Sequence, residues 1–215
     1  MQRAAAGTCE PLWERISHDA LLKKHIRKHV HPSEHMFKKM NFLTSTSIRI
    51  LSFLLSDPLR QFHGREIARQ LGVSAGAANQ YLRRFRELGL LEMDKRGRTI
   101  LYRANLRNPA SRQFKVLFNI LALDDLLNDI KPFSDRIVLF GSCAEGTDTK
   151  DSDIDLFILS AEPPVLQRRI GGYSQKIDRK ITPIVVDSIE MAKMRIRDKP
   201  LYERISRGIT LWERE

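Results

Sequence analysis

Apolar residues recur at helical spacing through the first half of the chain, between residues 48 and 88. The run Ile48–Leu55 predicts one helix, and His63–Leu71 predicts a second with its apolar positions on one face. Gly72–Ser74 combines a turn glycine with a serine that can cap a third helix, expected over Ser74–Leu88. We therefore expect three short helices in close succession.

Two runs of strand-like composition follow these helices. Leu90–Met93 and Thr99–Tyr102 are rich in apolar and β-branched residues. The connecting segment Asp94–Arg98 contains a glycine and three basic residues. The pattern predicts a β-hairpin with a basic tip.

The second half of the chain mixes helical and strand patterns. Pro109–Leu127 predicts one connecting helix packed on both sides, whereas Arg136–Phe140 and Ser152–Leu159 predict buried strands. Leu201–Leu211 predicts a helix, a break at Gly208 and a short strand. The expected packing positions of the connecting helix are Phe114, Leu117, Phe118, Leu121 and Leu126.

Candidate chemistry gathers where the first of these strands ends. Gly141 and Ser142 form a turn whose N–H groups and hydroxyl could hold phosphate oxygens. Asp153 and Asp155 follow after ten residues and face one way in a strand, which suits Mg²⁺ or Mn²⁺. Taken separately, these features also fit an ordinary turn and a solvated acidic edge. Taken together, they indicate a nucleotide and metal site.

This pattern resembles the minimal nucleotidyltransferases of the DNA polymerase beta superfamily, whose hallmark is Gly-Ser, about ten residues and Asp-x-Asp. The resemblance spans roughly residues 110–215 and implies a mixed sheet with flanking helices. It implies transfer of a nucleoside monophosphate from an NTP, such as ATP, to an acceptor. Gly141 and Ser142 would hold the β- and γ-phosphates, and Asp153 and Asp155 would be catalytic and bind the metals.

One departure from the family pattern concerns a third carboxylate that active members carry on a later strand. The matching stretch, Arg179–Val186, has Thr182 at that position and Pro183 after it, which suits an edge strand or a bulge. Two interpretations stay open. Either activity survives with a weak second metal site, helped by Asp178 or Asp187, or the domain binds a nucleotide and has lost its chemistry.

The charge of the chain is distributed unevenly. The net charge is +11, and residues 1–110 hold 20 Lys or Arg against 9 Asp or Glu, whereas residues 111–215 hold 17 of each. A basic half joined to a neutral half favours a polyanionic partner for the basic half.

The helices and hairpin of residues 44–105 resemble the winged helix-turn-helix fold of transcription regulators. That resemblance implies binding to double-stranded DNA through the major groove. A solvated basic face on a protein-docking or dimerisation module is the alternative. The residues expected to face DNA are Asn79, Gln80, Arg83 and Arg84 on the third helix and Lys95, Arg96 and Arg98 on the wing.

The expected fold class is therefore α+β. The expected division is an N-terminal helical extension (1–43), a winged helix-turn-helix domain (44–108), a connecting helix (109–131) and a nucleotidyltransferase domain (132–215). One hypothesis is an Mg²⁺-dependent nucleotidyltransferase with an unknown acceptor, tethered to DNA by the winged helix; members of such families modify partner proteins or small molecules. The other is a DNA-binding regulator with a catalytically degenerate transferase-like half. Winged-helix regulators often dimerise, so a homodimer is among the expected assemblies.

The cysteines and histidines add little to this picture. Cys9 and Cys143 provide no disulfide framework, and Cys143 fits a small residue in the phosphate turn better than a nucleophile. Histidines clustered between residues 25 and 35 lack a matching third ligand, which favours a solvated helix over a zinc site. No membrane-spanning run or signal peptide is apparent, so we expect a soluble cytoplasmic protein.

Overall fold

The structure is a computed structural model that describes residues 43–177 and 179–215. Thr44–Glu215 form one compact unit. The N-terminal extension and its histidine cluster lie outside the described residues, as does Asp178.

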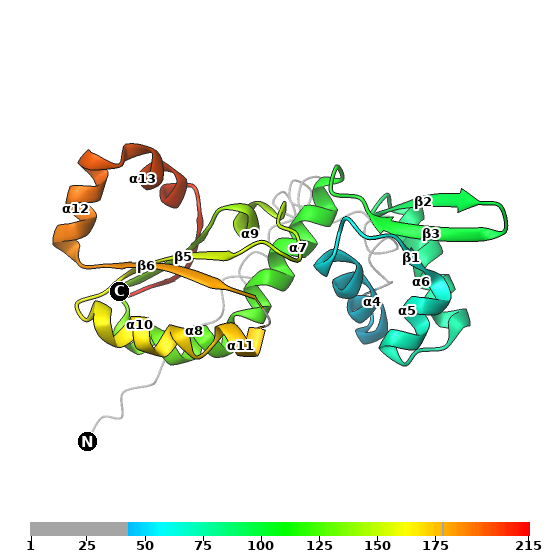
Figure 1. Cartoon of the computed structure of the whole chain (residues 1–215), viewed down its shortest axis with the longest axis horizontal. Helices are drawn as coiled ribbons and strands as arrows, with labels where there is room; N and C mark the ends of the chain where they lie inside the picture. The colour runs from blue at the N-terminus through cyan, green and yellow to red at the C-terminus, as the bar shows by residue number, and fades with distance from the viewer. Residues whose placement is uncertain (1–42, 178) are drawn as a thin grey trace, which may run out of the picture. The chain divides into compact units, whose positions relative to one another are not determined.

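Three helices follow one another at the start of the described chain (Figure 1), as predicted. They are α4 (Ser45–Ser56), α5 (Gly64–Leu71) and α6 (Ala75–Glu87). Each begins at a side chain that accepts a backbone N–H hydrogen bond, namely Thr44, His63 or Ser74. Their shared core consists of fully buried apolar side chains, including Ile50, Leu54, Ile67, Ala78, Leu82 and Phe85.

The hairpin is longer than predicted and its turn is shorter. The three-stranded antiparallel sheet has the order β1-β3-β2, with β1 (Phe62–His63), β2 (Leu91–Arg96) and β3 (Thr99–Ala104). Lys95 and Arg96 pair with Ile100 and Thr99, so the predicted five-residue loop is wrong. Gly97, with φ of 61°, permits a two-residue turn that lets the ladder continue to its end.

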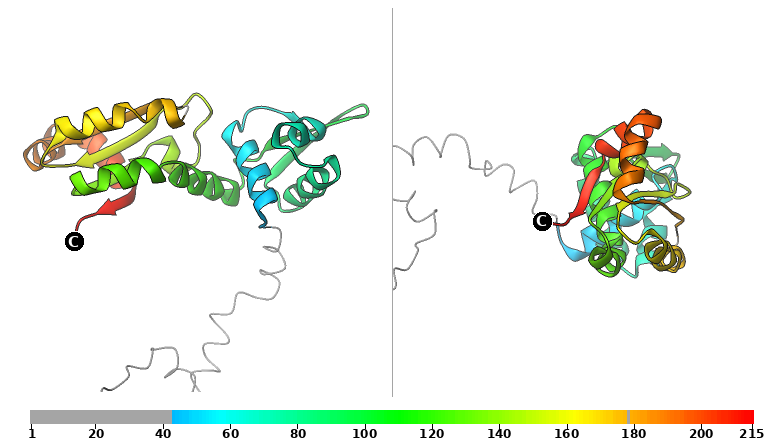
Figure 2. Two further views of the ribbon diagram at one scale, coloured as in Figure 1. Left: turned by 90° about the horizontal axis from the view of Figure 1, so that it is seen from below. Right: turned by 90° about the vertical axis from the view of Figure 1, so that its left-hand side faces the viewer.

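The predicted single connecting helix is two helices, α7 (Pro109–Ala122) and α8 (Asp124–Ile130), with the break at Leu123 (Figure 2). Asp124 and Asp125 occupy the first turn of α8, where carboxylates stabilise a new helix N-terminus. A 3₁₀ turn, η1 (Lys131–Phe133), follows α8 and contains Pro132.

The buried face of α7 also differs from the prediction. Leu117 and Leu121 are 46% and 60% exposed, whereas Lys115 and Val116 are buried. Leu126 on α8 is fully buried, as expected. The helical period of the apolar residues was detected correctly, but the period alone did not reveal which face meets the rest of the chain.

The second sheet has four strands in the order β6-β5-β4-β7. β4 pairs antiparallel with both β5 and β7, and β5 pairs parallel with β6, so the expected mixed sheet is confirmed. Pro183 lies in the edge strand β6, as its missing N–H requires. The strands are β4 (Arg136–Phe140), β5 (Ile154–Leu159), β6 (Ile181–Val186) and β7 (Ile209–Glu213).

Helices lie on both faces of this sheet (Figure 1). On one face, α8 and α10 (Pro163–Gly171) pack on side chains such as Leu139 and Leu156. On the other face, α12 (Ser188–Arg197) and α13 (Lys199–Ser206) pack on Phe140 and Phe157. The remaining short helices are α9 (Ser142–Glu145) and α11 (Ser174–Ile177). Because alternate residues of β5 face opposite sides, Asp155 lies on the α12 and α13 side.

Candidate nucleotidyl-transfer site and nucleic-acid interface

Gly141 brings the turn into contact with the acidic strand. Its φ of 69° and ψ of −156° are accessible to glycine and strongly disfavoured for other residues. A Cβ at this position would also collide with the Asp155 carboxylate. Phe140 pairs with Asp155 in the ladder between β4 and β5, so the register places the turn beside that carboxylate. The sequence motif is therefore one contiguous site.

Ser142 begins the short helix α9. The N–H groups of Ala144 and Glu145 donate to the Gly141 carbonyl at 3.1 and 3.2 Å. The N–H groups of the first helical residues, Ser142 and Cys143, have no partner within the helix ladder. Together with the half-buried Ser142 hydroxyl, they provide donors of the kind that hold phosphate oxygens.

Two carboxylates and two donors line the adjoining sheet edge. Lys180 Nζ and Thr182 Oγ1 each lie 3.1 Å from Asp153 Oδ2. Thr182 is in register with Asp155 across the parallel pair of β5 and β6. The four side chains therefore lie on one face of the sheet. Asp153 and Asp155 share that face, as the sequence pattern predicts.

The two carboxyl groups have different electrostatic environments. Hydrogen bonds from Lys180 and then from Thr182 lower the pKa of Asp153. Burial raises the pKa of Asp155; the Arg204 charge opposes this rise, and the Asp153 charge adds to it. Among the described residues, no side chain donates a hydrogen bond to Asp155. A cation beside Asp155 would relieve the repulsion between the carboxylates and favour its ionised form.

No third carboxylate completes this site among the described residues. Those residues contain no group of three His, Cys, Asp or Glu side chains that could hold a metal ion. Thr182 occupies the position in register with Asp155. Asp187, which the sequence offered as a substitute, follows the far end of β6, about 16 Å along the strand from Thr182. Its carboxylate caps α12 by accepting from Glu190 N at 2.7 Å. The suggestion that Asp187 helps the metal site is therefore wrong.

A buried polar cluster contacts both ends of the motif, and the sequence analysis did not predict it. Arg179 donates to the Ser152 carbonyl from Nε at 3.1 Å and from Nη2 at 2.8 Å. Arg179 Nη2 also lies 3.1 Å from Cys143 Sγ, and Cys143 Sγ lies 3.4 Å from the Asp153 carbonyl. Arg179 therefore links the residue after Ser142 to the residue before Asp153.

The anionic centre of this cluster is Asp148, which is 1% exposed. Its Oδ2 lies 3.2 Å from Lys115 Nζ and 3.1 Å from Arg179 Nη1, and its Oδ1 accepts from Asn119 at 3.0 Å. Lys115, 3% exposed, also donates to the Leu55 carbonyl at 2.6 Å. The available sequence signal was a lysine inside the apolar helical run of α7.

Cys143 is fully buried, and burial, with a further contribution from Asp148, raises the pKa of its thiol to about 11. The thiolate fraction at pH 8 is then on the order of one in a thousand. We expect iodoacetamide at pH 8 to leave Cys143 unmodified in the native protein and to alkylate it in urea, as measured by peptide mass spectrometry. Rapid labelling of Cys143 in the native protein would contradict a buried, protonated thiol and would favour a nucleophilic role for it.

The predicted DNA-facing residues of α6 do not share one orientation. Gln80 and Arg83 are exposed, whereas Arg84 is half-buried and forms an ion pair within the helix at 3.3 Å. Asn79 is half-buried, and its Oδ1 lies so close to Gly64 that a Cβ there would be 2.7 Å away. Gln80 and Arg83 are therefore better placed than Asn79 to reach an external ligand.

The predicted wing residues Lys95, Arg96 and Arg98 are all exposed on the hairpin. Arg96 Nε lies 2.8 Å from Asp94 Oδ2, and Arg96 Nη2 donates to Gln61 at 3.4 Å. These contacts compete with phosphate for Arg96, so Lys95 and Arg98 offer the more accessible charges.

Comparisons with known proteins identify both halves of the chain. Residues 122–207 match the nucleotidyltransferase domain family, and residues 43–92 match the winged helix-turn-helix DNA-binding family. Over 67 residues the chain is 37% identical to MJ0141 of Methanocaldococcus jannaschii, which is named as a candidate protein adenylyltransferase; the match covers 28% of this chain and 68% of that protein.

Solved structures with partial similarity include a protein from E. coli described as a predicted DNA-binding transcriptional regulator, at 25% identity and a TM-score of 0.33, covering 47% of this chain and 97% of that one. A toxin-antitoxin structure with AMP-PNP shares 26% identity at a TM-score of 0.33, covering 45% and 75% of the two chains. The repressor BigR from Xylella fastidiosa shares 19% identity at a TM-score of 0.33, covering 46% and 94%.

Within the described ranges, no helix combines the length and the apolarity needed to cross a membrane. The family matches agree with the two sheets of the fold and the helices around them, the winged helix around α6 and the mixed sheet beside the acidic motif. The chain belongs to the nucleotidyltransferase domain family and carries a winged helix-turn-helix DNA-binding domain ahead of its transferase domain.

Proposed function

We propose that this protein is an Mg²⁺-dependent nucleotidyltransferase that moves a nucleoside monophosphate from an NTP to an acceptor, tethered to DNA by its winged helix. The observation that carries the proposal is the contact between the Gly141 turn and Asp155, with Asp153 on the same face. This contact joins phosphate donors to a pair of carboxylates.

The residues present fit a hard divalent cation. Asp155 lies beside a second carboxylate, and burial raises its pKa, so a cation would stabilise its ionised form. A bound cation would supply charge neutralisation at the reacting phosphate and activation of the acceptor oxygen. The chain itself holds the NTP phosphates at Ser142 and keeps the carboxylates in place through Thr182 and Arg179.

In the proposed reaction, the acceptor oxygen forms a bond to the α-phosphorus while the bond from that phosphorus to the bridging oxygen breaks. Pyrophosphate leaves, and the acceptor hydroxyl loses its proton. The relative from M. jannaschii is named for protein adenylyl transfer, so we propose ATP as the donor and a protein hydroxyl as the acceptor.

Calorimetric titration with each NTP, with and without Mg²⁺, tests the nucleotide site without knowledge of the acceptor. We expect Mg²⁺-dependent binding that weakens at least about tenfold in Asp153→Asn, because one metal-coordinating carboxylate is lost. Asp151→Asn is the matched control, since Asp151 is an exposed acid in the same loop. Absence of binding by every NTP under both conditions would contradict the proposal.

A second candidate function is a DNA-binding regulator whose transferase half senses a nucleotide without turnover. Lys180 supports it, because its ammonium group occupies one oxygen of Asp153. Thr182, in place of a third carboxylate, supports it as well. Under this alternative, nucleotide binding would persist without product formation.

Both functions use DNA binding, which can be measured directly. Replacing the exposed Arg83, Lys95 and Arg98 by glutamine should weaken DNA binding and reduce the slope of log affinity against log salt by roughly three. Fluorescence anisotropy with a duplex at several salt concentrations would measure this. Unchanged affinity would argue against DNA binding by this face. A charge-matched control replaces three exposed arginines of the transferase half, Arg168, Arg197 and Arg207.

A further inference from the structure

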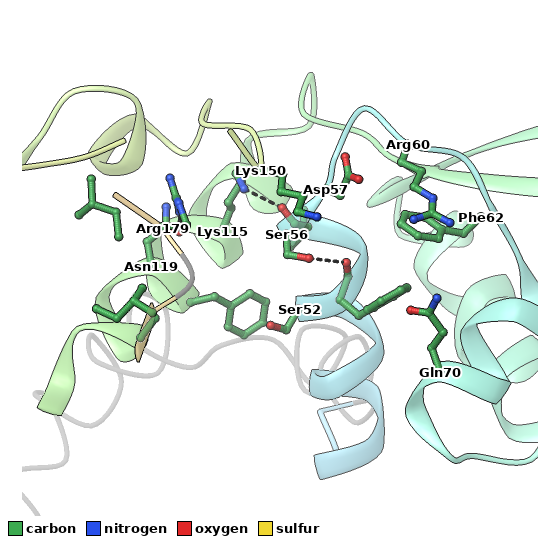
Figure 3. A pocket seen from close by; sticks show the side chains of 16 residues that line it. Ser52, Ser56, Asp57, Arg60, Phe62, Gln70, Lys115, Asn119, Lys150 and Arg179 are labelled. Atoms are coloured by element: carbon green, nitrogen blue, oxygen red, sulfur yellow. Dashed lines mark hydrogen bonds between the residues drawn. The ribbon is translucent and has the colours of Figure 1, made fainter. Parts of the chain in front are cut away.

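A pocket of about 400 Å³ lies between α4 and α7 and extends to the segment that leads into β5 (Figure 3). Ile154 contributes to its wall. Because Ile154 packs in the core on the α8 and α10 side of the sheet and Asp155 faces the opposite side, the pocket lies behind the carboxylate pair. It is therefore separate from the site proposed for nucleotidyl transfer.

One end of the pocket has an excess of positive charge. Figure 3 shows Lys115, Asn119, Lys150 and Arg179 gathered to one side of the end of α4. Lys115 and Arg179 share the single carboxylate of Asp148, so this buried cluster carries one uncompensated positive charge. Burial, as the largest influence, lowers the pKa of Lys115 despite the nearby Asp148 charge.

The exposed Lys150 adds a further cation at the same end. Asp57 is the single carboxylate among the residues that line the pocket. An uncompensated buried charge is unfavourable in a protein interior, and an anion placed against it would relieve the cost.

The rest of the pocket is aromatic and carries little net charge. Phe53 of α4 and Phe118 of α7 are both half-buried and line it. Arg60 lies over the Phe62 ring at 4.7 Å from its centroid and is paired with Glu66, so its charge is largely compensated. Half-exposed phenylalanine rings favour a ligand with a flat ring that can stack on them.

We propose that this pocket binds a small anion with a flat ring, of the size of a nucleoside monophosphate. Its anionic group would contact Lys150, beside the excess positive charge of the Lys115, Asp148 and Arg179 cluster, and its ring would contact Phe53 and Phe118. A volume of about 400 Å³ falls within the usual range for small-molecule sites. Because Phe53 belongs to α4 of the winged helix and Lys150 lies just ahead of the carboxylate pair, the ligand would contact both functional halves of the chain.

Calorimetric titration of the full chain with AMP tests this site, using the Asp153→Asn/Asp155→Asn variant in EDTA so that the transfer site is disabled. We expect one AMP per chain. Phe118→Ala should weaken AMP binding roughly tenfold through loss of stacking. Lys150→Glu should weaken it roughly tenfold or more, since it replaces an attractive charge by a repulsive one.

Lys193→Glu is the charge-matched control, because Lys193 is exposed on α12 and does not line the pocket; it should leave AMP affinity unchanged. Circular dichroism would verify that each variant is folded, and Lys150→Glu tests the site even if Phe118→Ala misfolds. Absence of AMP binding, or equal affinity in Lys150→Glu and its parent, would overturn the proposal. Inorganic phosphate binding as tightly as AMP would overturn the role given to the rings. Because the parent lacks both carboxylates, these outcomes are independent of whether nucleotidyl transfer occurs.

Discussion

Replacing Asp153 and Asp155 together by asparagine should reduce nucleotidyl transfer by roughly a thousandfold or more, because a metal clamp supplies several kcal/mol of transition-state stabilisation. Asparagine keeps the shape of each side chain and removes the charge that holds a cation. The fold should persist, since the Asp153 side chain is partly exposed and the substitution also removes a repulsion next to Asp155. Incorporation of label from α-³²P-ATP into protein would measure transfer, and thermal unfolding would report the fold.

The same substitution at Asp151 provides the comparison. Asp151 is exposed and lies just ahead of the motif, so Asp151→Asn removes one negative charge from the same loop without touching the carboxylate pair. It should retain activity close to that of the parent. Undiminished transfer by the double variant would show that the reaction does not depend on the carboxylates of Asp153 and Asp155.

Asp148→Ala should lower the free energy of unfolding by about 3–5 kcal/mol, because it leaves the buried Lys115 and the partly buried Arg179 without their shared partner. Asp148 is 1% exposed and lies within 3.2 Å of Lys115 Nζ and Arg179 Nη1. Loss of Asp148 would also release Arg179, which braces the loop ahead of Asp153. Urea unfolding followed by circular dichroism would measure the change.

A double-mutant cycle separates the charge effect from general damage. Lys115→Met leaves Arg179 paired with Asp148 and should cost less than Asp148→Ala. In the Lys115→Met background, Asp148→Ala leaves one unpaired cation instead of two, so its cost should fall by about 0.5–3 kcal/mol. Asp151→Ala, at an exposed position of the same loop, should change stability by no more than about 0.5 kcal/mol. Equal costs for Asp148→Ala and Asp151→Ala would show that the buried cluster contributes nothing.

Several elements could be predicted because their causes are local. The run Arg136–Phe140 is apolar and β-branched, and it forms β4 with those bounds. Ser74 follows a glycine that ends the preceding helix in the left-handed conformation, and it caps α6 as expected. The helix, the break at Gly208 and the final strand were also confirmed. Capping, turn geometry and periodicity act over a few residues, so a single sequence displays them.

The errors in the prediction have non-local causes. The wing ladder extends to Arg96 because each added pair is stabilised by the opposite strand, which no single run reveals. The connecting segment divides at Leu123 because α8 packs its apolar residues on the sheet core while α7 follows a different course. Asp187 lies close to Thr182 in sequence, but a strand of extended backbone separates them.

By itself, the sequence determined that this chain has a basic winged-helix half and a nucleotidyltransferase half with a Gly-Ser turn and two carboxylates on one face. Those properties depend on local backbone preferences, residue spacing and charge, all of which involve residues close together in the sequence. Only the tertiary structure decided that Asp155 meets Gly141, that Thr182 stands in register with it, and that Lys115, Asp148 and Arg179 form one buried cluster. These contacts join residues far apart in the chain, and strand register and helix packing bring them together only when the whole domain folds.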